Sequence, residues 1–360
     1  MKKILVAMSG GVDSSVAAKL LLERGFDVTG VTLKLYSNED INSKEGTRTC
    51  CSLADIEDAR SVCRRLGIEH LVFNFTGLFK ETVMGRMASG YLAGITPNPC
   101  IDCNRFIKFD ALLARALTLG YDGIATGHYA RIYYDEAARR WMLARAEDSS
   151  KDQSYVLYGM TQEQLARTLL PLGSLKKSEI REIAQAGGFI NAQKPDSQDI
   201  CFVPDGDYAS FIEGFAGSAG TPGSFVDAHG EKLGQHKGIA HYTIGQRKGL
   251  GLALGTPAFV TAKDACANTV TVGGGAQLFS KALIAGDVNL IAVASLDAPL
   301  PVQAKTRYSQ PLQAATLYPH GEDKIRLEFE QAQRAITPGQ AVVFYDGDRV
   351  VGGATIERAQ

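Results

Sequence analysis

The most informative hydrophobic pattern lies at the start of the chain. Residues 4–8, ILVAM, form an uninterrupted apolar run, which is typical of a strand buried on both faces of a parallel sheet. The sequence SGGVDSS begins directly after it, and residues 16–24 predict a helix that ends at Gly25. The pattern therefore predicts a strand, a glycine turn and a helix in immediate succession.

The alternation of strands and helices continues over the first 200 residues. Strands are predicted at residues 27–35, 70–75 and 123–129, a hairpin at 131–134 and 141–144, and helices at 53–66, 78–92, 105–119, 162–170 and 178–186. In helix 53–66 the spacing of apolar residues places Cys63 on the core face. Residues 96–103, TPNPCIDC, are expected to be non-helical, because each proline also restricts the residue before it. This order predicts an α/β fold with a doubly wound, mostly parallel sheet, in which ligands bind beyond the carboxyl ends of the strands.

After residue 200 the pattern changes. Glycine and proline become frequent, and short β-rich runs replace the helical periodicity. These runs are residues 258–262, 269–272, 303–308, 324–329 and 341–345. The change predicts three domains: an α/β domain over residues 1–200, a small β-rich central domain over 201–280, and a C-terminal β-barrel over 281–360.

Composition and charge narrow the class of protein. The chain has 360 residues, a formal net charge of −1 and 45% hydrophobic residues, as expected of a globular protein with several domains. No apolar run approaches the roughly 20 residues that cross a bilayer. The apolar run within residues 1–8 is too short for a signal peptide. Seven cysteines, an odd number, favour a reducing compartment over a disulfide framework. We therefore expect a cytoplasmic protein that does not enter a membrane.

The turn after the first strand has the chemistry of a phosphate site. Gly10 and Gly11 leave the backbone N–H groups accessible, and serine hydroxyls with a helix N-terminus add donors and partial positive charge. A Walker loop would need a lysine before its last Ser/Thr, and none occurs between Ser9 and Ser15. SGGVDSS instead resembles the PP-loop of the ATP pyrophosphatases, which release pyrophosphate and leave AMP on a substrate oxygen.

Two cysteines stand in contexts that favour sulfur chemistry. Cys103 follows the double-proline segment and precedes a predicted helix, a position that can lower the pKa of a thiol below about 8.5. Cys201 lies in DSQDICF, beside the predicted domain boundary. The alternative is that each is an inert buried cysteine, which is common for this residue type.

Seven motifs in order resemble those of the bacterial tRNA-specific 2-thiouridylases. They are SGGVDSS, TPNPCIDCNRFIKF, ATGHYAR, KDQSY, DSQDICF, YTIGQRKGLG and TPGQAVVFYDG. The resemblance covers essentially the whole chain and implies a PP-loop catalytic domain, a central domain and a C-terminal β-barrel. It also implies ATP-dependent thiolation, with Mg²⁺, at C2 of the wobble uridine in tRNAs for lysine, glutamate and glutamine.

The resemblance also assigns residues. Cys201 would carry a persulfide and Cys103 would be the nucleophile, with a disulfide between them closing the cycle. The ATP-binding set would be Ala7, Met8, Ser9, Gly10, Gly11, Val12, Asp13, Ser14, Leu33 and Gly127. The residues that meet the target base or tRNA would be Asn98, Pro99, Cys100, His128, Lys151, Asp152, Gln153, Arg307, Tyr308 and Gln340. From the residues alone, His128 also fits a satisfied core histidine and Lys151 to Gln153 a solvated loop.

Two questions stay open at this point. Position 100 is often aspartate in the family and is cysteine here, so Cys100, Cys103 and Cys201 could instead hold a [4Fe–4S] cluster. We favour the persulfide route, and apart from that cluster no metal site is predicted. The sulfur donor would be a cysteine desulfurase or a sulfur-relay protein. The rival functions are another PP-loop ligase or amidotransferase, and a tRNA-binding module with a regulatory ATP site.

Overall fold

The computed structural model describes residues 1–37, 40, 53–195, 200–203 and 205–360. Most of the polar loop over residues 37–49, together with Cys50, Cys51 and the DSQD part of DSQDICF (196–199), lies outside these ranges. In the described ranges no helix is long and apolar enough to span a membrane.

The N-terminal domain is built on a parallel sheet, as predicted. The strand order is β3-β2-β1-β4-β7, and every neighbouring pair is parallel. The strands are β1 (Lys3–Ala7), β2 (Asp27–Lys34), β3 (His70–Asn74), β4 (Gly123–Ala125) and β7 (Thr168–Leu169). β2 and β4 flank β1 on opposite sides, so the chain reverses its winding direction beside β1, where open α/β sheets bind ligands.

Helices cover both faces of this sheet. One face carries α1 (Val12–Glu23), α2 (Leu53–Leu66) and α8 (Lys177–Ala186). Ile4 and Val6 pack toward that face and Leu5 toward the other, which is the period of two expected of a strand buried on both sides. Cys63 is buried against Met8, with a sulfur–sulfur distance of 3.3 Å. Its predicted core position is therefore confirmed, and burial raises the pKa of this thiol to about 11.

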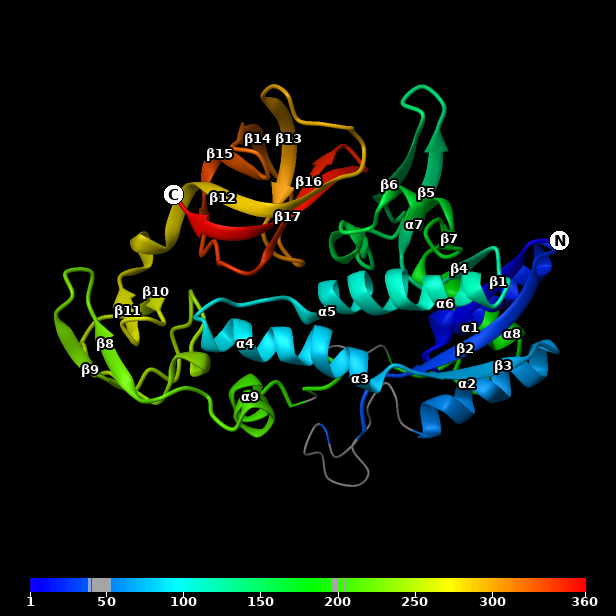
Figure 1. The fold of residues 1–360 in the computed structure, drawn as a ribbon, viewed down its shortest axis with the longest axis horizontal. Coiled ribbons are helices and arrows are strands. Elements are labelled where there is room, and N and C mark those ends of the chain that lie inside the picture. Colours follow the sequence, from blue (N-terminus) through cyan, green and yellow to red (C-terminus); the bar gives the residue numbers. More distant parts are fainter. Residues whose placement is uncertain (38–39, 41–52, 196–199, 204) are drawn as a thin grey trace.

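The other face is covered by two long helical rods. The first joins α3 (Thr76–Phe79), a π-helical segment η2 (Lys80–Gly85) and α4 (Arg86–Leu92). The second joins α5 (Pro99–Asp102), the π-helical segment η3 (Cys103–Ala111) and α6 (Leu112–Thr118). Both rods run lengthwise through the middle of the molecule (Figure 1).

Three predicted boundaries were wrong. The segment 96–103 is not wholly extended, because Pro99 occupies the first helical position, where its missing N–H costs nothing, and the Asn98 side chain caps the turn. Helix α1 begins at Val12, not residue 16, so half of SGGVDSS is helical. The helix predicted at 162–170 is shorter, since α7 (Gln162–Ala166) gives way to strand β7.

The remaining elements form a hairpin, a central sheet and a barrel. The hairpin is β5 (Ala130–Asp135) and β6 (Arg140–Arg145), and η4 (Ser154–Leu157) follows it. The central part has α9 (Tyr208–Ala216), η5 (Ile239–His241), η6 (Gly275–Leu278) and a sheet of β8 (Gly223–Val226), β9 (Lys232–His236), β10 (Phe259–Asp264) and β11 (Thr269–Gly273). The barrel strands are β12 (Phe279–Leu290), β13 (Leu300–Lys305), β14 (Gln313–His320), β15 (Lys324–Arg334), β16 (Ala341–Asp346) and β17 (Arg349–Ala359).

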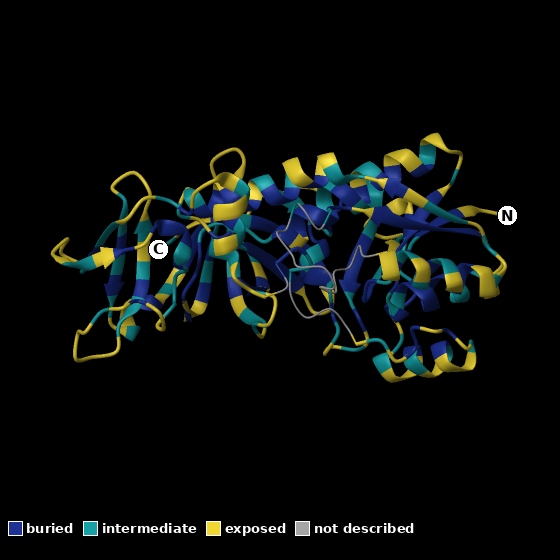
Figure 2. Cartoon of the chain, turned by 90° about the horizontal axis from the view of Figure 1, so that it is seen from below, coloured by how far each residue is buried: buried dark blue, intermediate teal, exposed yellow. Residues whose placement is uncertain are grey.

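The barrel is closed because β12 pairs with both β15 and β17. It lies above the two helical rods, with the central sheet at the far end from the N-terminus (Figure 1). The β5–β6 hairpin joins the barrel edge through a pairing of Ala144 with Arg349. Buried residues continue from the N-terminal sheet through the rods toward the barrel (Figure 2). The predicted fold class, a parallel α/β domain followed by a β-rich part and a β-barrel, is confirmed.

Candidate active site

The loop predicted to bind phosphate, residues 9–15, packs closely against the backbone of Asp55. It is called the phosphate loop below. Gly10 has a left-handed φ of +72°, and a β-carbon there would lie 2.5 Å from the carbonyl oxygen of Asp55. Only glycine fits this position. The loop leads straight into α1, and the first N–H groups of a helix have no acceptor within the helix. Free N–H groups and a helix dipole are the features that favour an anion, here at the carboxyl end of β1, so the predicted phosphate site is consistent with this geometry.

Side chains hold the carbonyl groups of the loop. The Ser14 and Ser15 hydroxyls donate to the Gly11 carbonyl at 3.2 and 3.1 Å. The Asn191 amide donates to the Gly10 carbonyl at 3.0 Å, as does the Lys194 ammonium at 3.2 Å. The loop conformation is thus stabilised from a segment about 180 residues away, for which the sequence offered no signal.

The phosphate loop contains no lysine. A lysine from another helix contacts it instead. The Lys177 ammonium, at the start of α8, donates to Asp13 Oδ1 at 2.7 Å, and the Tyr129 hydroxyl donates to the same oxygen at 2.6 Å. The Asp148 carboxylate accepts a hydrogen bond from the Lys177 backbone N–H at 3.0 Å and so fixes the first turn of α8. The structure therefore places a cation beside a phosphate loop that contains none. Sequence analysis missed Lys177, because nothing local distinguishes it from Lys176.

Gly127 lies against the phosphate loop. It follows β4, and a β-carbon there would lie 2.7 Å from the Ser14 backbone nitrogen and 2.9 Å from the Asp13 carbonyl carbon. The turn after β4 is therefore in backbone contact with the start of α1. Leu33 lies near the end of β2, the strand on the other side of β1. This arrangement is consistent with the predicted ATP-binding set, which stays a prediction.

Replacing Gly127 with alanine is expected to weaken ATP binding by roughly ten- to hundredfold. An added methyl group at 2.7 Å must displace the loop backbone, and overpacking of this kind costs about 1–3 kcal/mol. Equilibrium ATP binding measures the effect. Gly77→Ala is the matched control, since its β-carbon would meet nothing within 4 Å. Equal ATP affinity in the Gly127 variant and the control would contradict the close-packed site.

His128 is buried beside the loop rather than open to solvent. Its Nδ1 lies 2.7 Å from Thr126 Oγ1 and its Nε2 lies 3.5 Å from Lys108 Nζ. Burial, followed by the charge of Lys108, lowers the pKa of His128 well below its usual range. Its burial agrees with the core-histidine alternative. Its predicted contact with the substrate stays a prediction.

The helix that contains Lys108 also carries Cys103. Cys103 is 9% exposed and begins the π-helical segment η3, one turn after the Asn98 cap. The Asn98 Oδ1 accepts from the Cys100 backbone N–H at 3.1 Å, and the Cys100 side chain is exposed. π-Helical segments are frequent at functional sites. One helical segment thus runs from Cys103 to Lys108, which lies beside His128 and hence next to Gly127.

Cys201 packs on the same hydrophobic cluster as Cys103. Cys103 is a buried member of this cluster, and Cys201 is half-buried at its edge. The Tyr36 hydroxyl donates to the Cys201 carbonyl at 2.7 Å. In the described part of the chain, no three His, Cys, Asp or Glu side chains are arranged to hold a metal ion, and this includes Cys100, Cys103 and Cys201. Both the persulfide route and the cluster alternative stay predictions.

The barrel is docked beside the segment that contains Asn98. The Gln340 amide donates to the Thr96 carbonyl at 2.8 Å, and the Thr96 backbone N–H donates to the Pro338 carbonyl at 2.9 Å. A cavity of about 360 Å³ opens here, lined by Asn98 and Gly339 among others. Gln340 therefore positions the segment that leads to Cys100.

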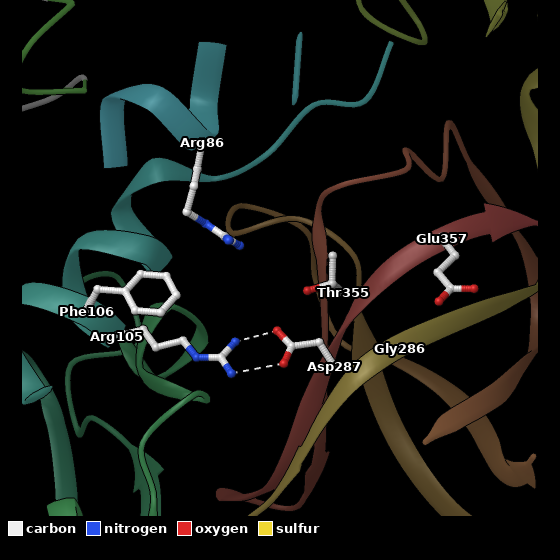
Figure 3. Close-up of a pocket in the computed structure, with 7 residues that line it drawn as sticks. All are labelled: Arg86, Arg105, Phe106, Gly286, Asp287, Thr355 and Glu357. Carbon is white, nitrogen blue, oxygen red and sulfur yellow. Dashed lines mark hydrogen bonds and ion pairs between the residues drawn. The ribbon is translucent and has the colours of Figure 1, made fainter. Parts of the chain in front are cut away.

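A second cavity, of about 400 Å³, adjoins the first and shares Arg86 and Thr355 with it. Figure 3 shows it between the helical rods and the barrel, where the Arg105 guanidinium forms a two-point ion pair with Asp287. None of its lining residues belongs to the predicted ATP-binding set. This contact fixes the barrel to the rod that carries Cys103.

Two residues of the KDQ segment (151–153), Asp152 and Gln153, form hydrogen bonds within the protein. Asp152 is 6% exposed, and its carboxylate accepts from the Ala146 N–H at 3.1 Å and from the Ser154 hydroxyl at 2.9 Å. Gln153 exchanges hydrogen bonds with the backbone of Tyr129 at 2.9 and 2.8 Å. Since the Tyr129 hydroxyl holds Asp13, Gln153 helps to position the phosphate loop. The predicted tRNA contacts of Lys151, Asp152 and Gln153 stay predictions.

Tyr308 presents an exposed ring at the docked barrel. It is 45% exposed, and burial, then Asp152 and Cys100, raise the pKa of its hydroxyl. The Lys305 ammonium lies 5.4 to 5.8 Å from the ring centres of Tyr155, Tyr308 and Tyr345 and donates to the Tyr308 carbonyl. Lys305 thus fixes the turn that carries Arg307 and Tyr308.

Three family models together match nearly the whole chain. The tRNA methyl transferase HUP domain matches residues 2–205, the tRNA methyl transferase PRC-barrel domain 209–274, and the aminomethyltransferase β-barrel domain 280–356. The chain is similar to the tRNA-specific 2-thiouridylase MnmA of Moorella thermoacetica, at 54% identity over 98% of this chain and 99% of that protein. It is similarly related to proteins of the same name from Clostridioides difficile (51%) and Acetivibrio thermocellus (50%), over 99% of each chain.

Proposed function

The chain belongs to the family of tRNA-specific 2-thiouridylases, and on this premise we propose how its residues replace the C2 oxygen of a tRNA wobble uridine with sulfur. The reaction consumes ATP and forms AMP and pyrophosphate. A uracil C2 oxygen is a poor leaving group, whereas an oxygen attached to AMP leaves readily. The rival functions, an unrelated PP-loop ligase and a purely regulatory ATP site, are set aside by this membership.

The observation that carries the proposal is the helical rod that begins at Pro99. It presents Cys103 at its start and Lys108 one turn and a half later, beside the His128–Gly127 turn that touches the phosphate loop. A nucleophilic sulfur and an ATP site are thereby joined through one rigid element. The barrel contributes Gln340, whose amide donates to the Thr96 carbonyl of the segment that leads to Cys100.

The backbone N–H groups, Lys177 and Asp13 of the ATP site have separate tasks. The N–H groups at the start of α1 and the glycine loop bind phosphates, and Lys177 supplies the positive charge that stabilises the departing pyrophosphate. Bound Mg²⁺ would neutralise phosphate charge, and the Asp13 carboxylate, which accepts hydrogen bonds from Lys177 and Tyr129, would hold it. The N–H groups, Lys177 and Asp13 come from three elements that converge at one end of the sheet.

Sulfur transfer then takes place in two displacement steps. The terminal sulfur of a Cys201 persulfide attacks C2, the C2–O bond breaks, and AMP leaves with its oxygen. The Cys103 thiolate then attacks the Cys201 sulfur, which breaks the S–S bond to the transferred atom and releases the thiocarbonyl. The product is a Cys103–Cys201 disulfide, which an external thiol reduces before the next turnover. The donor that loads Cys201 is a cysteine desulfurase or a sulfur-relay protein.

Nucleoside mass spectrometry tests this function. Unmodified glutamate tRNA is incubated with the protein, ATP, Mg²⁺ and a persulfide source, then digested. We expect a uridine in which one oxygen is replaced by sulfur, and AMP with pyrophosphate as the nucleotide products. ADP and inorganic phosphate as products, or an unmodified nucleoside pool, would refute the proposal.

A further inference from the structure

The carbonyl group of Gly10 in the phosphate loop is held by two side chains from one distant turn. The Asn191 amide donates to this carbonyl at 3.0 Å, and the Lys194 ammonium donates to it at 3.2 Å. The Lys194 backbone N–H donates to the Asn191 carbonyl at 3.0 Å, so both side chains come from a single turn beyond α8. Asn191 and Lys194 are called the carbonyl clamp below.

The carbonyl clamp fixes the direction of an N–H group as well as that of a carbonyl. A trans peptide plane points its C=O and its N–H in opposite directions, and the described ranges of the chain contain no cis peptide bond. The Gly10 carbonyl shares its plane with the Gly11 N–H. Because the clamp holds the carbonyl on one side of the loop, the Gly11 N–H points to the other side.

Asn191 also fixes the next peptide plane, through a serine hydroxyl. Its amide nitrogen donates to Ser15 Oγ at 2.9 Å, and the Ser15 hydroxyl donates to the Gly11 carbonyl at 3.1 Å. Both side chains lie in the core, since Asn191 is 3% exposed and Ser15 is fully buried. The Gly11 carbonyl shares its plane with the N–H of Val12, the first residue of α1. The directions of two successive N–H groups are therefore set from within the protein, and successive backbone N–H groups of this kind bind anions.

Lys194 is oriented by two carboxylates on α2. Its ammonium donates to Asp55 Oδ1 at 2.6 Å and to Asp58 Oδ2 at 2.7 Å. Burial alone would lower the pKa of Lys194, but the hydrogen bonds with Asp55 and Asp58 outweigh burial and raise this pKa. The ammonium is therefore charged, and two carboxylates balance its charge. Its contribution to the loop is the hydrogen bond to the Gly10 carbonyl.

We propose that Asn191 and Lys194 are positioning residues of the ATP site, which set the affinity of the phosphate loop for the β- and γ-phosphates by fixing the direction of the Gly11 N–H. This inference rests on the proposed ATP-dependent thiolation. Its consequence is selective. Loss of the clamp weakens binding of the phosphates, whereas adenosine has no phosphate and does not depend on the direction of this N–H group.

Equilibrium binding of ATP and of adenosine tests the carbonyl clamp. Lys194→Met is expected to weaken ATP binding roughly ten- to a hundredfold, because it removes a charged hydrogen-bond donor. Asn191→Ala leaves the ion pairs of Lys194 in place and should weaken ATP binding roughly five- to tenfold, as expected for a neutral donor. In both variants the affinity for adenosine should stay within about twofold of the parent. A substitution that merely disrupted the fold would lower both affinities.

Lys19→Met is the matched control for Lys194→Met. Lys19 also forms an ion pair with a carboxylate, that of Glu23 on the same helix α1, so the ATP affinity of this variant should match the parent. If ATP and adenosine affinities fall together in either clamp variant, or if either binds ATP as tightly as Lys19→Met, the clamp has no positioning role. AMP formation and thiolation by the parent protein would then still support the proposed function. If the parent protein binds ATP no more tightly than adenosine and forms no AMP, both proposals fall.

Discussion

Replacing Cys103 or Cys201 with serine is expected to abolish thiolation of tRNA, by on the order of a thousandfold or more. Serine occupies nearly the same volume, so Cys103 at 9% exposure can be replaced without a cavity. A hydroxyl can neither carry nor accept the transferred sulfur, and removal of a covalent nucleophile has effects of this size or larger. The measurement is the rate of 2-thiouridine formation with excess persulfide donor.

Other readouts distinguish the two cysteines from merely structural ones. Each serine variant should still form AMP and pyrophosphate in a single turnover with bound tRNA, because the phosphate loop and Lys177 are intact. Cys266→Ser, at an exposed position in the turn between β10 and β11, is the control and should keep full activity. Trapping a Cys103–Cys201 disulfide after one turnover without reductant would support the order of transfer given above.

Cys100→Ser decides between the two sulfur mechanisms. In the persulfide route Cys100 is an exposed neighbour, and its serine variant should retain thiolation within a few-fold. In the cluster route all three cysteines are ligands, so Cys100→Ser would be as inactive as Cys103→Ser. Thiolation that occurs only after anaerobic loading with iron and sulfide would overturn the persulfide mechanism, and turnover by metal-free protein would exclude the cluster.

Replacing Asp13 or Lys177 with alanine is expected to lower AMP formation by roughly a hundred- to a thousandfold. The Lys177 ammonium is 2.7 Å from the Asp13 carboxylate, and both groups lie at the loop where phosphates bind. Loss of one preorganised charge that stabilises a developing anion typically costs this much in kcat. The measurement is pyrophosphate release at saturating ATP and tRNA.

Lys176→Ala is the matched control for Lys177. Lys176 is the preceding residue and exposed, and its backbone N–H donates to Glu179, a contact that alanine preserves. Affinity for tRNA should be unchanged in the Lys177 variant, since the lysine lies on α8, outside the barrel. Equal pyrophosphate release by the two lysine variants would remove Lys177 from the mechanism.

Several features were predictable because they depend on neighbours in the sequence. The apolar run at residues 4–8 indicates a strand buried on both faces, and β1 is such a strand. The spacing in helix 53–66 places Cys63 in the core, where it lies. Alternating strands and helices, followed by short β-rich runs, predicted a parallel sheet and a barrel. Local periodicity encodes which side of an element is buried, and this pattern needs no distant partner to be recognised.

Boundaries at the site were harder to predict, even though their causes are local. The helix start at Pro99 depends on the Asn98 side chain reaching the Cys100 N–H, and a proline can equally end a helix or begin one. Helix α1 starts at Val12, within SGGVDSS, with Gly11 as its N-cap and no side chain capping it. The residue types permit both outcomes, and hydrogen-bond geometry selects one.

Only the tertiary structure decided which distant residues meet at the site. The sequence predicted a phosphate loop and two reactive cysteines, but Lys177 lies 164 positions from Asp13 in the chain and has no local signature. Gly127 contacts Ser14 because β4 is hydrogen-bonded to β1, and Gln340 reaches Thr96 because the barrel docks on the helical rods. Strand order and domain docking arise from packing summed over the whole molecule. For that reason the local pattern determined the elements and their buried faces, while long-range packing determined which side chains the site contains.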